Sequence, residues 1–263
     1  MFQIIDVMEQ IAPRHLAEEW DNVGLLVGRA DAEISTALIA LDVLDAVIDE
    51  AIKHGANAII THHPVIFSPI SRINDASPAG RRLLRLIENK IAVYSAHTNL
   101  DAADGGVNDT LFDTLGLIQK EFICEGRPGV FGGRAGKLSV SMTLSQFAKH
   151  VQKCLRLDTI SFCGDAHAGV NKIGIAAGGT ANIDFFKAVK RAGCDTFVTS
   201  DIKFTMARAA ADMGLNLVDA THFASENIFA SALKGQLAVA LPGLQLIVSQ
   251  VDGQVFNTIS IEG

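Results

Sequence analysis

Short apolar runs alternate with segments of helical spacing along most of this 263-residue chain. We expect buried strands at residues 36–43, 57–61 and 91–97, separated by helices at residues 44–55 and 80–90. Strands that alternate with helices form parallel βαβ units with right-handed crossovers. This alternation therefore predicts an α/β fold.

A glycine-rich stretch at residues 125–138 interrupts the alternation and predicts a boundary or a set of tight turns. A second alternating half follows, with expected helices at 144–155, 182–193, 204–214 and 224–238 and strands at 159–164, 172–179, 195–201 and 216–223. The tail at 244–261 predicts a strand, an Asp-Gly turn and a short return. We expect two α/β lobes of mainly parallel sheets with flanking helices, the first from residues 1–125 plus about 220–263 and the second from about 126–219.

The composition narrows the classes of function. The formal net charge is −7, which argues against a nucleic-acid-binding protein because such proteins usually have a basic surface stripe. No apolar stretch approaches the roughly 20 residues that a membrane-spanning helix needs, and the N-terminus lacks the features of a signal peptide. Four cysteines form no C-x-x-C pair and are expected to be reduced thiols, so we predict a cytoplasmic protein with no membrane partner.

Metal-binding side chains follow three of the predicted strands. Ligands of open parallel sheets bind beyond the carboxyl ends of the strands. The exits hold His62 and His63, then His97, Asp101 and Asp104, and finally Asp219, His222 and Glu226. A mixed set of imidazoles and carboxylates suits Zn, Mn, Fe or Co.

The spacing of these residues favours two ions over one. Side chains of adjacent strand residues point to opposite faces, but at a strand end His62 and His63 can diverge onto neighbouring ions, and Pro64 keeps that turn extended. Two-metal sites hold their ions about 3.5–4 Å apart. If a helix begins after residue 221, His222 and Glu226 share one of its faces.

Each group also has a simpler interpretation. Two adjacent histidines alone are often a surface feature, His222 with Glu226 can be a helix-surface hydrogen bond, and residues 97–101 can be a capping and turn sequence. The glycine pair in residues 176–183 predicts a tight turn, with a phosphate cradle as the alternative. Asp201 could orient a neighbouring ligand, contact substrate, or cap a helix.

Six segments, taken in order, resemble one known family. They are LAEEWDNVGLLVG (16–28), THHPVIF (61–67), SAHTNLDAADGGVND (95–109), AAGGTAN (176–182), TSDIK (199–203) and DATHFASE (219–226). Together they are similar to the Nif-three-like family of dinuclear-metal hexameric proteins, often labelled GTP cyclohydrolase 1 type 2 homologs.

The resemblance implies a site, a cofactor and an assembly. Its metal ligands fall on His62, His63, Asp101, His222 and Glu226, with His97 as a further ligand. Glu226 would contact both ions and is the catalytic candidate. The cofactor would be two divalent ions per subunit (Zn, Fe, Mn or Co), in a cleft between the two lobes. The chain would form a ring-like homohexamer, a trimer of dimers.

This chain departs from the family pattern in the second half. Ser200 stands where many relatives have glycine, Phe204 and Thr205 where histidine is common, and Phe223 where tyrosine is common. The resemblance and the two-ion chemistry together predict a metal-dependent hydrolase of a nucleotide or phosphorylated small molecule, with ring opening of GTP as one form. The alternative is a non-catalytic metal-binding scaffold or metal-handling factor, which the missing histidines favour. DNA binding conflicts with the net charge.

Overall fold

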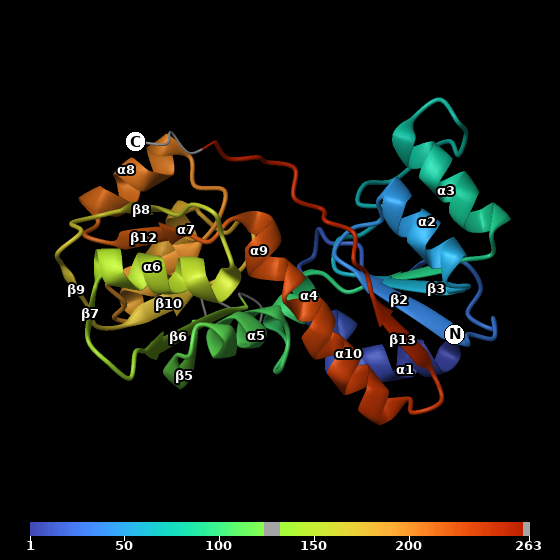
Figure 1. Ribbon diagram of the computed structural model, residues 1–263, viewed down its shortest axis with the longest axis horizontal. Helices are drawn as coiled ribbons and strands as arrows, with labels where there is room; N and C mark the ends of the chain where they lie inside the picture. The colour runs from blue at the N-terminus through green and yellow to red at the C-terminus, as the bar shows by residue number, and fades with distance from the viewer. Residues whose placement is uncertain (124–131, 260–263) are drawn as a thin grey trace. The chain divides into compact units, whose positions relative to one another are not determined.

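The computed structural model describes residues 1–123 and 132–259 of the chain. Its contacts divide it into two compact units, one formed by Met1–Gly106 with Phe229–Gly253 and the other by Val107–Ile228 with the segment that begins at Gln254. Each unit is a β-sheet with flanking helices (Figure 1). The predicted α/β class with two sheets is therefore confirmed.

The first unit contains a five-stranded sheet in the order β1-β4-β3-β2-β13. The strands are β1 (Gly24–Val27), β2 (Thr36–Ala40), β3 (Ala58–Thr61), β4 (Ala92–Ser95) and β13 (Gln245–Val248). All pair in parallel except β1, which runs antiparallel along β4. Because the strands run the same way, the carboxyl ends of β2, β3 and β4 lie at one edge of the sheet.

Helices cover both faces of this sheet (Figure 1). They are α1 (Phe2–Ile11), α2 (Asp45–Lys53), α3 (Pro78–Glu88), α4 (Thr98–Ala102) and α10 (Phe229–Ala240), with a short 3-10 turn η1 (Arg14–Leu16). Residues of α2 and α3, such as Ile48 and Leu86, pack with Leu38, Ile59 and Val93 of the strands. Burial on both faces explains why β2, β3 and β4 are continuous apolar runs.

The second unit contains a six-stranded sheet in the order β5-β6-β10-β11-β12-β8. Its strands are β5 (Ile118–Ile123), β6 (Gly133–Lys137), β8 (Ser161–Cys163), β10 (Ile173–Ile175), β11 (Thr196–Thr199) and β12 (Asn216–Asp219). Only β10, β11 and β12 pair in parallel, and the other neighbours are antiparallel. A separate two-stranded ladder joins β7 (Met142–Thr143) and β9 (Gly169–Val170).

The helices of the second unit are α5 (Val107–Thr114), α6 (Leu144–Leu155), α7 (Ile183–Arg191), α8 (Phe204–Asp212) and α9 (His222–Asn227). Phe185 stacks on Phe197 in the core with ring centroids 5.3 Å apart. Fully buried Arg134 lies over the Phe122 ring and donates to the Asp109 carboxylate at 2.5 Å. Buried charges of this kind must be paired, and this pair ties α5 to β6.

Several elements differ from the sequence-based expectation. The edge strand β1 and the antiparallel pair β5 and β6 were not expected. Of the glycine-rich stretch 125–138, residues up to 131 lie outside the described residues, and Gly133–Lys137 form β6. The expected return strand at the C-terminal end is wrong for the described residues 249–259, which contain no strand. Ser249 and Gln250 instead donate hydrogen bonds to the carboxylate of Glu50.

The unit boundaries at 106/107 and 228/229 differ from the expected positions near 125 and 220. Helix α5 contacts β6 and β10, and the Asn108 side chain accepts a hydrogen bond from the Ala177 N–H at 2.8 Å. Helix α9 contacts α5. These contacts place α5 and α9 in the second unit.

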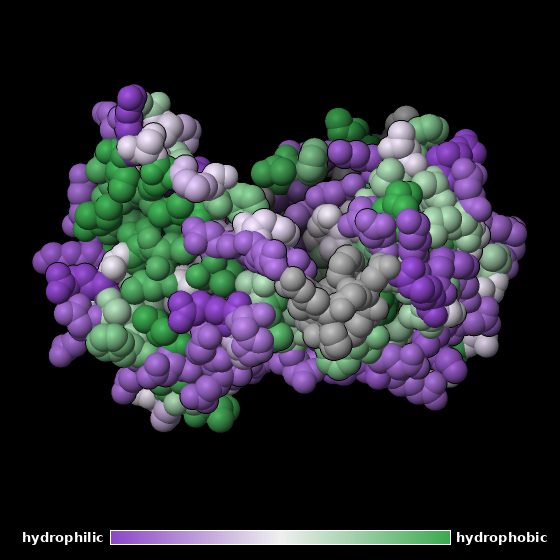
Figure 2. All heavy atoms as spheres, turned by 180° about the vertical axis from the view of Figure 1, so that it is seen from behind, coloured by the Kyte–Doolittle hydropathy of each residue, from purple (hydrophilic) through white to green (hydrophobic). Residues whose placement is uncertain are grey.

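The surface of the first unit is partly apolar. Seen from behind, this unit carries a broad apolar area (Figure 2). The exposed large apolar side chains of the first unit include Phe2, Trp20, Phe67, Ile70 and Ile73.

Over the residues that the structure describes, every helix is too short or too polar to cross a bilayer.

Candidate metal centre

The two adjacent histidines follow strand β3, at the edge where the carboxyl ends of the parallel strands meet. The fully buried His62 donates a hydrogen bond from Nδ1 to the Ala96 carbonyl at 3.0 Å. His63 donates from Nδ1 to Asp42 Oδ1 at 2.8 Å. An Nδ1–H that donates to oxygen fixes the tautomer, so the candidate ligand atom of each ring is Nε2.

His97 follows the neighbouring strand β4 and has the same arrangement. Its Nδ1 donates to Asp21 Oδ1 at 2.9 Å, and the other oxygen of Asp21 accepts the Thr98 N–H at 3.0 Å, at the start of α4. Burial would raise the pKa of Asp21, but the hydrogen bonds from His97 and Thr98 outweigh burial and hold that pKa to about 2. Asp21 therefore stays anionic and orients the His97 ring.

These three histidines converge. One ring nitrogen from each of His62, His63 and His97 lies within 4.8 Å of the other two. Asp101, in α4, approaches the same place, with Oδ1 at 3.7 Å from His62 Nε2. Two ligands of one zinc ion are at most about 4.2 Å apart, given Zn–N and Zn–O distances of about 2.0–2.2 Å. Asp101 and His62 are therefore close enough to share one divalent ion, and His63 and His97 lie beside them.

The second unit presents a second set of donors. His222 begins α9 and Glu226 follows one turn later, so the predicted shared helix face is confirmed, with His222 Nε2 at 3.0 Å from Glu226 Oε2. His222 Nδ1 donates to Asp201 Oδ2 at 2.8 Å. The hydrogen bond to Glu226 raises the pKa of His222 to about 9 against the effect of burial, and Asp201 adds to the increase.

Unusual backbone conformations hold this second set. Thr221, directly before His222, has φ +55°, and Asp201 has φ +54°, both in a region that non-glycine residues rarely adopt. Gly178 has φ +68°, and a Cβ at that position would overlap Glu226 Oε1. A Cβ at Gly179 would lie 2.9 Å from Asp201 Oδ2. The glycine pair is therefore a tight turn that makes room for two carboxylates.

The family follows from comparison with known proteins. Residues 1–254 match the family model Duf34/NIF3 (NGG1p interacting factor 3). The chain belongs to the DUF34/NIF3 family. Its relatives include the "GTP cyclohydrolase 1 type 2 homolog" of Clostridium perfringens, which is 38% identical over 85% of each chain. The homolog of the same name from Clostridium acetobutylicum is 32% identical over 94% of each chain.

Solved structures agree with this assignment. The Bacillus cereus protein related to NIF3 superimposes with a TM-score of 0.91 at 26% identity, covering 98% of each chain. The reduced HcgD of Methanocaldococcus jannaschii gives a TM-score of 0.80 at 30% identity, over 95% of this chain and 97% of that one. The predicted Nif-three-like membership and the α/β fold of this DUF34/NIF3 protein are therefore confirmed.

Within each unit, the structure places the predicted site residues of this DUF34/NIF3 chain in two sets. His62, His63, His97 and Asp101 form the first-unit donor set. His222 and Glu226 form the second-unit donor set. Asp104 is exposed, and Asp219 accepts the Thr221 N–H at 3.0 Å, so neither joins a set.

Two residues that orient histidines were not identified from the sequence, and the role of a third, Asp201, was left undecided. Asp21 and Asp42 hold His97 and His63, and neither was singled out. Asp42 could have been found, because it lies just beyond β2, whose carboxyl end neighbours that of β3. Asp201 orients His222, while the residue before α8 is Lys203, so Asp201 does not cap that helix.

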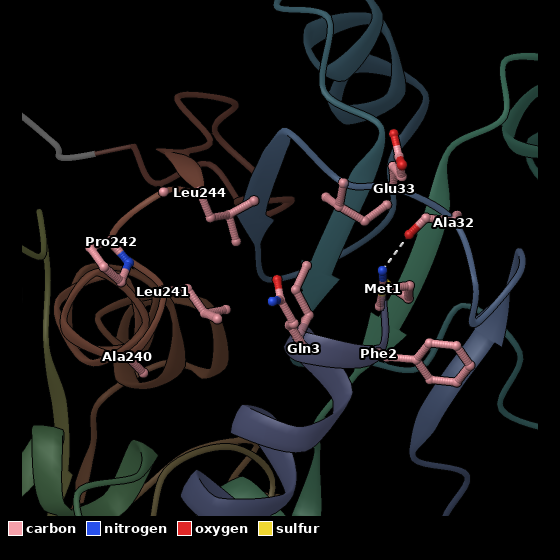
Figure 3. Close-up of a pocket in the computed structure, with 12 residues that line it drawn as sticks. Met1, Phe2, Gln3, Ala32, Glu33, Ala240, Leu241, Pro242 and Leu244 are labelled. Carbon is pink, nitrogen blue, oxygen red and sulfur yellow. Dashed lines mark hydrogen bonds between the residues drawn. The ribbon is translucent and has the colours of Figure 1, made fainter.

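One cavity of the first unit lies apart from the histidines. It has a volume of about 570 Å³ and is lined by the start of α1, residues 32–34 and residues 240–244. Figure 3 shows Met1, Gln3, Leu241 and Leu244 around it, with the Met1 amino group donating to the Ala32 carbonyl. Glu33 is the one acidic residue of the lining, which contains no histidine or cysteine. This cavity therefore lacks the donors of a transition-metal site.

Proposed function

We propose that the protein binds two divalent metal ions and hydrolyses a nucleotide or a related phosphorylated small molecule. The supporting observation is that all four candidate histidines have Nδ1 hydrogen-bonded to an oxygen acceptor: Ala96, Asp42, Asp21 and Asp201. Metal-ligating histidines almost always donate their other N–H in this way. The names of the relatives, which refer to GTP cyclohydrolase, are consistent with a nucleotide substrate.

We propose that both donor sets supply ligands to the metal ions. The first-unit donor set offers three imidazoles and one carboxylate, and the second-unit donor set offers one imidazole and one carboxylate. Two ions of four or more ligands each need more donors than either set supplies. Glu226 would be one of the residues that hold the ions, beside His222.

The chemistry then divides between the ions and the chain. Bound divalent ions would lower the pKa of water and polarise the group under attack. Asp21, Asp42 and Asp201 hold the imidazoles in position before substrate binds. The free-energy cost of ordering these rings is therefore not added to the reaction barrier. Glu226 is 3% exposed and is the proposed proton acceptor from the attacking water.

Metal content and turnover test this function together. Protein resupplied with Zn, Mn, Fe or Co should retain about two ions per chain and hydrolyse nucleotides or phosphoesters. His63→Ala and Glu226→Ala should lose both properties. His54→Ala and His167→Ala are matched controls, because each removes an exposed histidine from one unit, away from the donor sets, and should change neither. Wild-type protein that retains no ion, or whose turnover equals that of Glu226→Ala, would refute the proposal.

A metal-handling factor without turnover is the second candidate. Phe204, at the position where the family resemblance implied a histidine, is 79% exposed, so α8 begins without a proton-transferring side chain there. This function predicts two retained ions, no hydrolysis of any substrate, and transfer of the ions to a chelator-treated acceptor protein.

We also propose a homohexamer. Six chains of 28.0 kDa would give a particle of about 168 kDa. Light scattering after size exclusion measures that mass directly, and a monomer or dimer at micromolar concentration would contradict the proposal.

A further inference from the structure

Two large aromatic side chains are exposed beside the histidine group of the first unit. Trp20 is 59% exposed and Phe67 is 53% exposed. Their ring centroids are 5.9 Å apart, with 54° between the ring planes. Aromatic side chains with exposed faces are the surfaces on which flat ligands stack in many proteins.

Both rings also contact His97. The Trp20 ring lies 6.1 Å from the His97 ring at 73°, and the Phe67 ring lies 6.3 Å from it at 75°. His97 is itself 5.0 Å from His62 and 5.6 Å from His63, measured between ring centroids. A molecule that rests on Trp20 or Phe67 would therefore place its attached groups next to the donor set.

The backbone around each ring is anchored. Asp21, directly after Trp20, accepts hydrogen bonds from His97 and Thr98. Asn22 donates from its side chain to the Ile66 carbonyl at 2.6 Å, directly before Phe67. The backbone next to each ring is therefore held by hydrogen bonds, and Asp21 also positions His97, so a ligand meets a surface that is already ordered.

We propose that Trp20 and Phe67 form a stacking platform for the planar heteroaromatic base of a nucleotide substrate, a proposal that rests on the hydrolase function above. Every nucleobase has a π-face, and stacking on an aromatic side chain is a general way to bind one. A sugar phosphate without a base would gain nothing from these two rings. The platform selects for a flat ring and leaves its phosphate or leaving group to the metal site.

Trp20 is the only tryptophan of the chain, so its fluorescence reports on this surface alone. Metal-loaded full-length protein is titrated with GMP and AMP, and with ribose 5-phosphate as the probe without a base. We expect saturable quenching by both nucleotides and none by ribose 5-phosphate. Stacking on one aromatic ring contributes about 1–3 kcal/mol, so Phe67→Ala should weaken nucleotide binding roughly 5- to 150-fold.

Two variants make the result specific. Phe67→Tyr retains a ring and should restore most of the affinity that Phe67→Ala loses, which a purely structural role of the side chain would not predict. Phe204→Ala removes a 79% exposed aromatic of the second unit and should leave nucleotide binding unchanged. Equilibrium dialysis gives the affinity of Trp20→Ala, which has no fluorophore, and we expect a loss at least as large as that of Phe67→Ala.

Three results would overturn the platform. They are equal affinity for GMP and ribose 5-phosphate, wild-type affinity in Phe67→Ala, and a Trp20 signal that a soluble quencher cannot reach because a second copy of the chain covers it. Failure of the hydrolase proposal is distinguishable. Base-dependent quenching without turnover refutes hydrolysis and keeps the platform, whereas turnover of phosphoesters without base preference refutes the platform and keeps hydrolysis.

Discussion

The two units hold their metal-competent side chains by different means. In the first unit, His62, His63 and His97 follow ordinary buried strands, and none of them has a positive φ. In the second unit, a single histidine is held between Thr221 and Asp201, both with positive φ, and beside a glycine that no other residue could replace without overlap. Regular strands can position a compact histidine group, whereas the isolated pair of His222 and Glu226 depends on a strained backbone.

The largest expected effect is on metal affinity, and it tests the close contact between Gly178 and Glu226 in the second unit. Gly178→Ala adds a Cβ that overlaps Glu226 Oε1, so Glu226 must move. We expect metal affinity to fall by more than about 100-fold, beyond the roughly 10- to 100-fold that loss of an orienting residue costs. Metal titration by calorimetry measures this change.

Gly193→Ala is the matched control. Gly193 also has positive φ, at +79°, but a Cβ there has no neighbour within 4 Å. Both variants should lose about 1–2 kcal/mol of stability from the left-handed backbone, and only Gly178→Ala should lose metal. Equal metal affinity in the two variants would show that the glycine does not shape the second-unit donor set.

An intermediate effect tests the first unit. Asp42→Asn weakens the acceptor that orients His63, and we expect metal affinity to fall about 10- to 100-fold with little change in stability. Asp45→Asn is the control, because Asp45 forms exposed ion pairs with Arg82 and Arg85 instead. If the two variants bound metal alike, His63 would not depend on Asp42.

The smallest expected effect is on stability, and it tests the backbone strain at Thr221. Thr221→Gly should relieve a conformation that costs roughly 1–3 kcal/mol, offset by the greater freedom of glycine in the unfolded chain. We expect a net gain of about 1 kcal/mol, which raises the Tm by about 2–4 °C. The same change at Thr61, a buried strand residue of the first unit, should lower the Tm. A lower Tm for Thr221→Gly would show that the backbone is not strained there.

The sequence predicted the histidines of the first-unit donor set better than the aspartates that orient them. His62, His63 and His97 follow apolar runs that form adjacent parallel strands, so their proximity follows from topology. Asp21 lies in the loop before β1, which a single sequence does not specify, whereas Asp42 follows β2 directly and could have been inferred from the expected pairing of β2 with β3. The pair β5 and β6 was missed because five of the six residues of β5 are exposed, so no apolar run marks it.

The second-unit donor set was predictable only in part. The spacing of His222 and Glu226 indicated a shared helix face, and α9 begins where that prediction required. The positive φ of Asp201 and Thr221 could not be predicted, since both residues usually adopt other conformations. Local preference is overridden here by the contacts that surround these residues.

The order of the chain has a consequence for synthesis. The first unit is interrupted by residues 107–228 and is completed only when α10 and β13 return to it. During translation, the backbone N–H and C=O groups on the outer side of β2 therefore have no strand partner until β13 is synthesised, more than 200 residues later. An unpaired edge in a partly made sheet invites pairing with other chains, so cotranslational chaperone binding should concentrate on this interval.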